Sequence, residues 1–180
     1  MRIIKDSALG LCVDYQERLM PAMRDGDAVI SRAKLLIEGL RILNVPVIVT
    51  EQYPKGLGRT VEVLRGALGD VNYCEKNAFS CCDDENIMKA IESSGKKNVI
   101  VFGVEAHVCV LQTVEDLIER GYNAVLAADC LSSRREADMR FALERARGSG
   151  AVLTTAEAIL FELQRYAAGD TFKSISKLVK

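Results

Sequence analysis

Short apolar runs alternate along this chain with segments whose apolar residues recur at helical spacing, and this alternation restricts the fold more than any other feature. The run at 98–102 (NVIVF) is the clearest, and the runs at 8–15 (ALGLCVDY) and 45–50 (VPVIVT) share its apolar character. Continuous apolar runs are typical of strands buried on both faces of a parallel sheet. Because helices separate the runs, the pattern predicts an α/β fold with helices on both faces of such a sheet.

The individual elements are predicted from periodicity and from residues that favour helix ends. The predicted strands are 8–15, 45–50, 71–75, 98–102, 122–127 and 151–153. The predicted helices are 27–43, 83–93, 108–120, 133–147 and a last one that Thr154 or Thr155 caps and that ends near Tyr166. Asp83 or Asp84 is expected to cap the second helix. The segment 51–70 is expected to be a loop or lid with a short helix near 61–65, and 167–180 either packs on the domain or reaches a partner.

Length and charge exclude several classes of protein. The chain has 180 residues, which fits one domain over 1–180. Its formal net charge is -1, so no strong field favours nucleic acid or a membrane surface. We find no apolar run of the ~18 residues that a membrane span requires. No long apolar segment follows the basic residues at the N-terminus, so a signal peptide is not expected. We therefore expect a cytoplasmic protein that binds neither nucleic acid nor membranes.

Six cysteines and one histidine restrict the redox and metal chemistry. No two cysteines form a CxxC pair, so a disulfide framework is not expected and a reducing cytosol fits better. The adjacent Cys81 and Cys82 are interpreted as structural. His107 alone cannot form a two-histidine zinc site, and we expect neither a metal nor a cofactor. A flavodoxin-like nucleotide binder would share the fold class, but no glycine-rich phosphate turn follows the first strand.

The chemistry is expected at the carboxyl ends of the strands, where parallel sheets bind ligands. Asp14 ends the first strand, Lys76 follows the third, and the segment 103–109 follows the strongest strand and enters a helix. A helix N-terminus and a nearby ammonium group both favour the thiolate of Cys109, which is the nucleophilic form. Asp14 would exchange the proton, and backbone N–H groups of the 105–109 turn would bind an oxyanion.

Each of these residues also has a structural interpretation. A cysteine on an apolar helix is more often a small core residue than a nucleophile. An acid at a strand end is often a turn residue, and a loop lysine is usually solvated. His107, two residues before Cys109, is expected to pack or to line the pocket rather than to act as the base.

Three segments together resemble the isochorismatase-like cysteine hydrolase superfamily: CVDYQ, EKNAFS and GVEAHVCVLQT. The likeness extends over nearly the whole chain. It is greatest to the isochorismatase-domain-containing branch, because VTEQYPKGLG and GVEAHVCV are features of that branch. The resemblance implies a doubly wound three-layer α/β/α fold with a six-stranded, mostly parallel sheet. It also implies an Asp–Lys–Cys triad at Asp14, Lys76 and Cys109, a cis peptide bond between Val104 and Glu105, and an oxyanion hole at the Glu105 and Cys109 amides.

Two departures from the superfamily narrow the expected activity. Nicotinamidases in it carry a histidine-containing metal site that this chain cannot supply. True isochorismatases cleave a vinyl ether without needing a cysteine nucleophile, so Cys109 favours amide or related acyl chemistry through a thioester. Glu105 is expected either to bind a substrate amine or cation, or to pair with a basic residue such as Lys55 or Arg59. The candidate pocket residues are Tyr15, Gln16, Tyr53, Phe79 and His107.

The expected activity is therefore that of an amidase-like hydrolase acting on a small molecule. The alternative is a catalytically silent binding or scaffold protein that keeps the fold. The resemblance favours a homo-oligomer, either a dimer or a tetramer.

Overall fold

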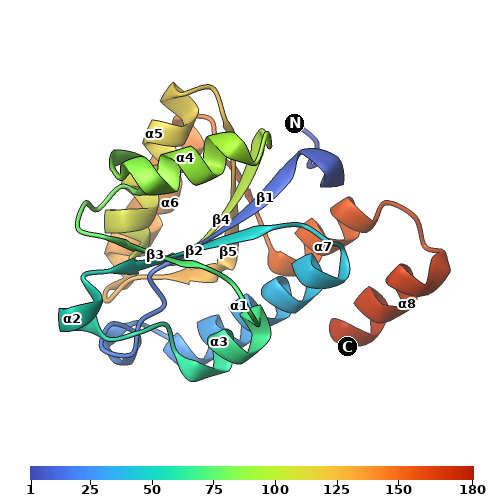
Figure 1. The fold of residues 1–180 in the computed structure, drawn as a ribbon, viewed down its shortest axis with the longest axis horizontal. Helices are drawn as coiled ribbons and strands as arrows, with labels where there is room; N and C mark the ends of the chain where they lie inside the picture. Colours follow the sequence, from blue (N-terminus) through green and yellow to red (C-terminus); the bar gives the residue numbers. More distant parts are fainter.

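In the computed structural model, which describes residues 1–180, six strands form one sheet between two layers of helices (Figure 1). The strand order is β3-β2-β1-β4-β5-β6, and every neighbouring pair is parallel. The strands are β1 (Ala8–Val13), β2 (Val47–Gln52), β3 (Tyr73–Lys76), β4 (Asn98–Val104), β5 (Asn123–Ser132) and β6 (Val152–Thr154). The predicted doubly wound α/β/α architecture is confirmed, and the sheet is entirely parallel rather than mostly so.

The helices divide between the two faces of the sheet. One face carries α1 (Gly26–Ile42), α3 (Glu62–Leu68), α7 (Ala156–Gln164) and α8 (Gly169–Leu178). The other carries α4 (Glu85–Ser93), α5 (Leu111–Glu119) and α6 (Glu136–Gly148), while the short α2 (Pro54–Leu57) follows β2. None of these helices is both long and apolar enough to cross a membrane.

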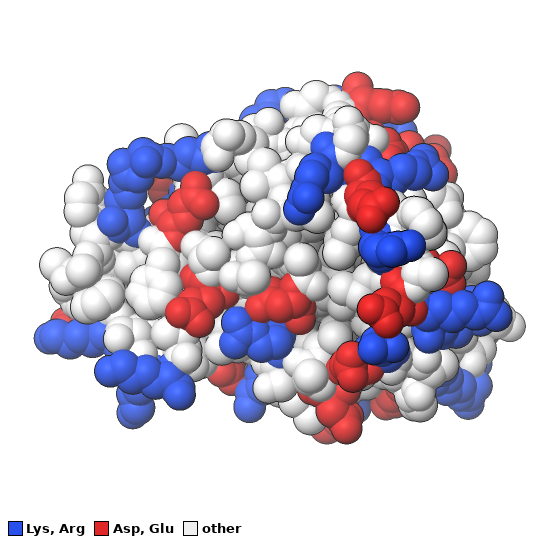
Figure 2. All heavy atoms as spheres, turned by 180° about the vertical axis from the view of Figure 1, so that it is seen from behind, with Lys and Arg blue, Asp and Glu red and all other residues white.

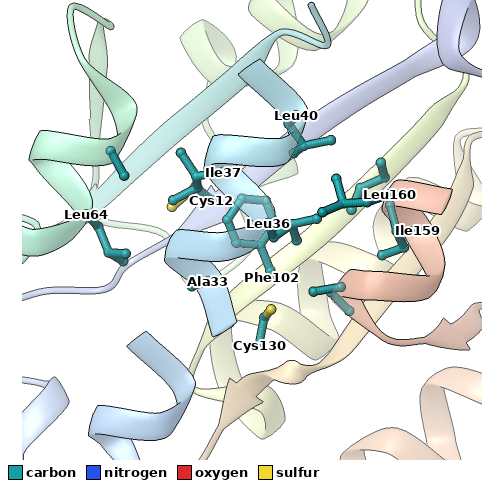
Figure 3. Packing of buried hydrophobic residues seen from close by; sticks show 14 of the residues in the cluster. Cys12, Ala33, Leu36, Ile37, Leu40, Leu64, Phe102, Cys130, Ile159 and Leu160 are labelled. Atoms are coloured by element: carbon teal, nitrogen blue, oxygen red, sulfur yellow. The ribbon is translucent and has the colours of Figure 1, made fainter. Parts of the chain in front are cut away.

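Each face of the sheet has its own apolar core. On the α1 face, Leu36, Ile37 and Leu40 pack against Phe102 of β4 and Leu160 of α7 (Figure 3). On the α5 face, the core consists mainly of alternate side chains of β1, β4 and β5 together with residues of α4, α5 and α6. Because both faces of the central strands are covered, these strands read as continuous apolar runs in the sequence.

The structure departs from the predicted bounds in several places. Strand β4 continues to Val104 and β5 to Ser132, and a register irregularity between Val101 and Gly103 accompanies the longer pairing. Helix α6 begins at Glu136, three residues later than predicted. The segment 51–70 contains two helices rather than one, and 167–180 forms α8, which packs on α1 and α7.

Helix caps follow the predicted residue types. The Asp84 carboxylate accepts hydrogen bonds from the N–H groups of Asn86 and Ile87 and caps α4, so of the two candidate aspartates it is this one that acts. Thr155 likewise caps α7 through the Ala158 N–H. These two caps fix where α4 and α7 begin.

Candidate active site

The carboxyl ends of β1 and β4 lie side by side at the point where the strand order reverses. Val13 is in register with Gly103, so the residues that follow, Asp14 and the 104–109 segment, leave the sheet next to each other. From β1 the chain winds to β2 and β3 in one direction, and from β4 it winds to β5 and β6 in the other. Ligands of open parallel sheets bind at such a reversal.

Asp14 is completely buried at this position. Its backbone takes the left-handed conformation, with φ of 55°, directly after β1. One carboxylate oxygen, Oδ1, accepts a hydrogen bond of 2.7 Å from Thr50 Oγ1. The other, Oδ2, accepts one of 2.7 Å from Lys76 Nζ, and both side chains of this ion pair are fully shielded from water. The carboxylate is therefore oriented by two strands of the sheet, β2 and β3.

Lys76 binds more acceptors than Asp14 alone. Its Nζ also donates to Gln52 Oε1 at 2.7 Å and to the carbonyl oxygens of Ala78 and Phe79 at 3.2 Å. Burial lowers the pKa of this amine, but the charge of Asp14, the interactions with Cys81 and Cys109 and the hydrogen bond to Asp14 together raise the pKa overall. The ammonium group is therefore the counter-ion of Asp14, and its donors are engaged within the protein.

Cys109 belongs to a π-helical turn, Ala106–Val110, that links β4 to α5. Only 6% of its surface is exposed. Burial raises the pKa of its thiol to about 12, and the charge of the nearby Asp14 adds to this effect, although Lys76 acts in the opposite direction. The helix end and the lysine do not compensate for burial beside a carboxylate, so the group rests as a thiol.

The turn that precedes Cys109 presents a free amide. The peptide bond between Val104 and Glu105 is cis. The Glu105 N–H finds no hydrogen-bond acceptor within the protein. The Glu105 carboxylate instead accepts bonds from the backbone N–H of Arg134 at 3.2 Å and from its Nε at 3.0 Å. Glu105 thus pairs with a basic residue, as one of the two alternatives predicts, but the partner is Arg134 rather than Lys55 or Arg59, because the loop after β5 packs on this turn.

The single histidine also contacts the loop after β5. His107 Nδ1 lies 3.0 Å from Ser133 Oγ, and His107 Nε2 lies 4.0 Å from Asp138 Oδ2. About a quarter of its side chain, 26%, is exposed. His107 packs at the edge of the turn rather than between Asp14 and Cys109.

The other expected pocket residues divide into two groups. Tyr15 and Gln16 are completely buried, so neither offers surface to a substrate. Tyr15 packs on Phe102 and donates to the Cys130 carbonyl, and Gln16 donates to the carbonyl oxygens of Gln52, at the end of β2, and of Gly58. By contrast, Tyr53 and Phe79 are 54% and 55% exposed.

A polar cavity of about 350 Å³ lies beside Lys76, the last residue of β3. Its wall consists of Tyr53, Pro54, Lys55, Glu75, Lys76, Asn77 and Asp84. Only one of these seven residues is hydrophobic, so the cavity suits a polar group. Cys109 is not part of this wall.

Three polar residues at the site were not singled out from the sequence: Thr50, Gln52 and Thr113. Thr50 and Gln52 lie at the end of a β-branched run, at the same edge of the sheet as Asp14. This position in the sequence could have identified them as candidate site residues. Thr113 had no such signal, because its role depends on a contact with Cys81. No group of three or more His, Cys, Asp or Glu side chains is placed to hold a metal ion.

Known proteins resemble this chain over most of its length. The isochorismatase domain model matches residues 8–158. Isochorismatase domain-containing protein 2 of Danio rerio is 43% identical over 97% of this chain and 87% of its own length. Isochorismatase domain-containing protein 1 of the same species is 41% identical over 94% of this chain, which spans only 59% of that relative. The corresponding Salmo salar protein is likewise spanned only to 62% of its length.

Two solved structures share the fold. The MAR1 ribonuclease of Caenorhabditis elegans superposes with a TM-score of 0.94 at 38% identity, covering 99% of this chain and 92% of its own. The YcaC gene product of Escherichia coli, an octameric hydrolase of unknown specificity, superposes with a TM-score of 0.93 at 27% identity, covering 99% and 90%. From the domain match and these relatives, the chain belongs to the isochorismatase family, in its domain-containing branch.

Proposed function

We propose that this protein is a cysteine hydrolase that cleaves a small amide or related acyl compound, with Cys109 as nucleophile. The observation that carries the proposal is the buried Asp14–Lys76 ion pair of 2.7 Å at the strand ends where the Cys109 turn begins. Asp14 lies near enough to Cys109 for its charge to raise the pKa of the thiol. A nucleophile, a base and an orienting third group within hydrogen-bond reach are the parts of covalent acyl transfer. Membership of a hydrolase family supports the same reaction class.

The acid–base state of the site determines the order of steps. Because Cys109 rests as a thiol, sulfur attacks the carbonyl carbon while its proton passes to Asp14. The leaving amine or alcohol then takes that proton from Asp14, and a thioester remains on Cys109. Water, losing a proton to Asp14, attacks the thioester, and the carbon–sulfur bond breaks to release the acid while the Cys109 sulfur takes the proton back from Asp14. Lys76, bonded to Asp14 over 2.7 Å, orients the carboxyl group that exchanges these protons.

The tetrahedral intermediates carry a negative oxygen that needs donors. The Glu105 N–H is unengaged within the protein and is proposed as one donor, with the Cys109 N–H as the other. Backbone donors fixed before the reaction stabilise such charge without reorganising. Tyr53 and Phe79, which are both exposed and follow β2 and β3 respectively, are proposed to contact the substrate. His107 borders the turn.

Two features support a small-molecule substrate over RNA, although a relative from Caenorhabditis elegans is named a ribonuclease. The formal net charge is -1, and basic and acidic side chains are interspersed on the face in Figure 2. Nucleic-acid binding depends on clustered positive charge. RNA cleavage is the second candidate, and incubation with a labelled single-stranded RNA tests it: we expect no cleavage that depends on Cys109.

We also propose a homo-oligomer, as the octameric relative supports, and a cytoplasmic site of action, since all six cysteines are free thiols. Sedimentation of the purified protein measures the first.

The nucleophile is tested with p-nitrophenyl acetate, an activated acyl ester. We expect nitrophenolate release and one acetyl group on the Cys109 peptide by mass spectrometry, and no acetylation of that peptide in Cys109→Ala. Cys74→Ala is the matched control, because Cys74 is a partly exposed thiol outside the triad and its loss leaves release unchanged. A folded Cys109→Ala protein that releases nitrophenolate at the wild-type rate contradicts the proposal.

A further inference from the structure

One face of α5 and of the turn before it contacts the segment 80–82, which lies a few residues after Lys76. Four residues lie on one helical face because they are separated by four, three and four positions: Cys109, Thr113, Asp116 and Arg120. The three polar members all bond to the segment 80–82: Thr113 to the Cys81 N–H, Asp116 to the Ser80 hydroxyl, and Arg120 to the Cys82 carbonyl over 3.4 Å. Helix α5, which begins two residues after Cys109, is thus bonded to the segment that begins four residues after Lys76.

Thr113 is the member of this face that also touches the nucleophile. Its side chain is completely buried. The hydroxyl accepts a hydrogen bond of 2.9 Å from the Cys81 N–H and donates one of 2.7 Å to the Cys109 carbonyl oxygen. This single hydroxyl therefore links the backbone N–H of Cys81 to the backbone carbonyl of Cys109. It acts as an acceptor in the first hydrogen bond and as a donor in the second.

The two sides of the triad differ in how they are joined. Asp14 and Lys76 are bonded directly through their side chains. The Cys109 turn comes from the other side of the strand reversal, and its backbone meets the 80–82 segment through Thr113. The same segment continues from Ala78 and Phe79, whose carbonyls accept from Lys76. The position of the sulfur relative to the Asp14–Lys76 pair is therefore coupled to this hydroxyl.

We propose that Thr113 is a positioning residue, which holds the Cys109 turn so that its thiol reaches Asp14; this inference rests on the proposed cysteine hydrolase activity. Thr113 contacts neither the substrate nor the reacting atoms in this scheme. It acts through the carbonyl of Cys109 and the amide of Cys81.

Thr113→Val tests the inference, because it keeps the shape and removes the hydroxyl. The Cys81 N–H and the Cys109 carbonyl then lose their shared partner, and the thiol moves away from Asp14. We expect acetylation of Cys109 by p-nitrophenyl acetate to slow by about tenfold or more, as small misplacements of reacting groups do. Alkylation of the same thiol by iodoacetamide near pH 8 is expected to become faster, since Asp14 and burial both keep the thiol protonated.

Three further variants separate positioning from general destabilisation. Thr113→Ser keeps the hydroxyl and should restore both rates to the wild-type values. Ser149→Ala removes a hydroxyl hydrogen bond of 2.9 Å to Glu115 of the same helix and should change neither rate. In the double variant with Asp14→Asn, Thr113→Val should have no additional effect on alkylation, because residues that act through one contact are not additive.

The inference is overturned if folded Thr113→Val reacts at Cys109 with wild-type rates, or if Thr113→Ser is as impaired as Thr113→Val. Should Thr113→Val not fold, Thr113→Ala also lacks the hydroxyl, and wild-type rates in that variant overturn the inference equally. Absence of acetylation in the wild-type protein counts against the proposed function, and the alkylation rates still test Thr113. Equal acetylation of wild type and Thr113→Val counts against the positioning inference alone.

Discussion

The thiol of Cys109 lies beside two opposite charges and almost out of contact with water. Burial and the Asp14 carboxylate raise its pKa to about 12, while Lys76 lowers it. A thiol of this kind reacts slowly with simple electrophiles at neutral pH, because the thiolate is the reactive form. It can still attack a bound carbonyl when a base takes its proton in the same step. At this site, reactivity is therefore tied to Asp14 and not to a standing thiolate.

Asp14→Asn is expected to change the two reactions of Cys109 in opposite directions. Removing the negative charge lowers the pKa of the thiol, so alkylation by iodoacetamide near pH 8 becomes faster, by about tenfold for each unit that the pKa falls. Acetylation by p-nitrophenyl acetate is expected to be lost, because the base is gone. Both products are measured on the Cys109 peptide by mass spectrometry.

Asp129→Asn is the matched control for Asp14→Asn. Asp129 lies on β5, where it binds Arg32 and the Ala156 N–H, and it does not contact the site. Both reactions of Cys109 should keep their wild-type rates in this variant. Acetylation that persists in folded Asp14→Asn would remove Asp14 from the role of base.

At the scale of the elements, the site depends on how closely β1 approaches β4. Gly103 lies near the end of β4 with φ of +151°, where a residue with a side chain is strained. A Cβ at this position would lie 2.1 Å from the Val13 carbonyl oxygen. Val13 directly precedes Asp14, and Gly103 precedes the cis peptide and the nucleophile turn. The absence of a side chain here lets the two strand ends carry their residues to one place.

Gly103→Ala is therefore expected to be destabilising by more than about 1 kcal/mol, because the native backbone conformation does not suit alanine. Acetylation of Cys109 should fall as well, since the strands separate where Asp14 and the turn begin. Urea unfolding and the acetylation assay measure the two effects.

Gly66→Ala in α3 is the comparison, because nothing lies within 4 Å of its added Cβ. Alanine in the helix should stabilise the protein by about 0.5–1 kcal/mol and leave acetylation unchanged. A Gly103→Ala protein as stable as wild type would show that the strand ends tolerate a wider separation.

At the scale of the whole molecule, two cores enclose most of the six cysteines. Five of the six are buried, and all are free. Burial raises the pKa of Cys81 from 9.0 to about 12, with the Asp14 charge adding to the effect. Burial likewise raises the pKa of Cys82 to about 11, with the charge of Asp116 adding to it. A thiol whose pKa is raised by folding stabilises the native state below the unfolded pKa, and this stability is lost as the pH rises toward the folded pKa.

The free energy of unfolding should therefore fall as the pH rises above 9, the unfolded value for cysteine. Each such thiol contributes a slope of about 1.4 kcal/mol per pH unit between the two pKa values. Urea unfolding at a series of pH values from neutral to alkaline measures the slope. Cys81→Ala should show a shallower decline than the wild type, and equal slopes for the two proteins would contradict the assignment.

Much of the architecture could be predicted because it follows from local patterns. The continuous apolar runs predict buried parallel strands, and the carboxyl ends of those strands then place Asp14, Lys76 and the turn of Cys109 at one edge. The family resemblance joined these three into a triad, which the spacing alone does not do. The longer β5 was missed because Asp129 interrupts its apolar pattern, and only contacts with Arg32 and α7 accommodate that carboxylate.

The sequence by itself determined the fold class, the order of the strands along the chain and the edge of the sheet where chemistry is expected, because these depend on periodicity within short segments. Only the tertiary structure decided that Cys109 rests as a thiol, that Glu105 pairs with Arg134, and that Tyr15 belongs to the core. It also decided that Thr113 bridges the two sides of the site. These properties depend on burial and on contacts between segments far apart in the chain, such as Cys81 and Thr113, and no local pattern encodes them.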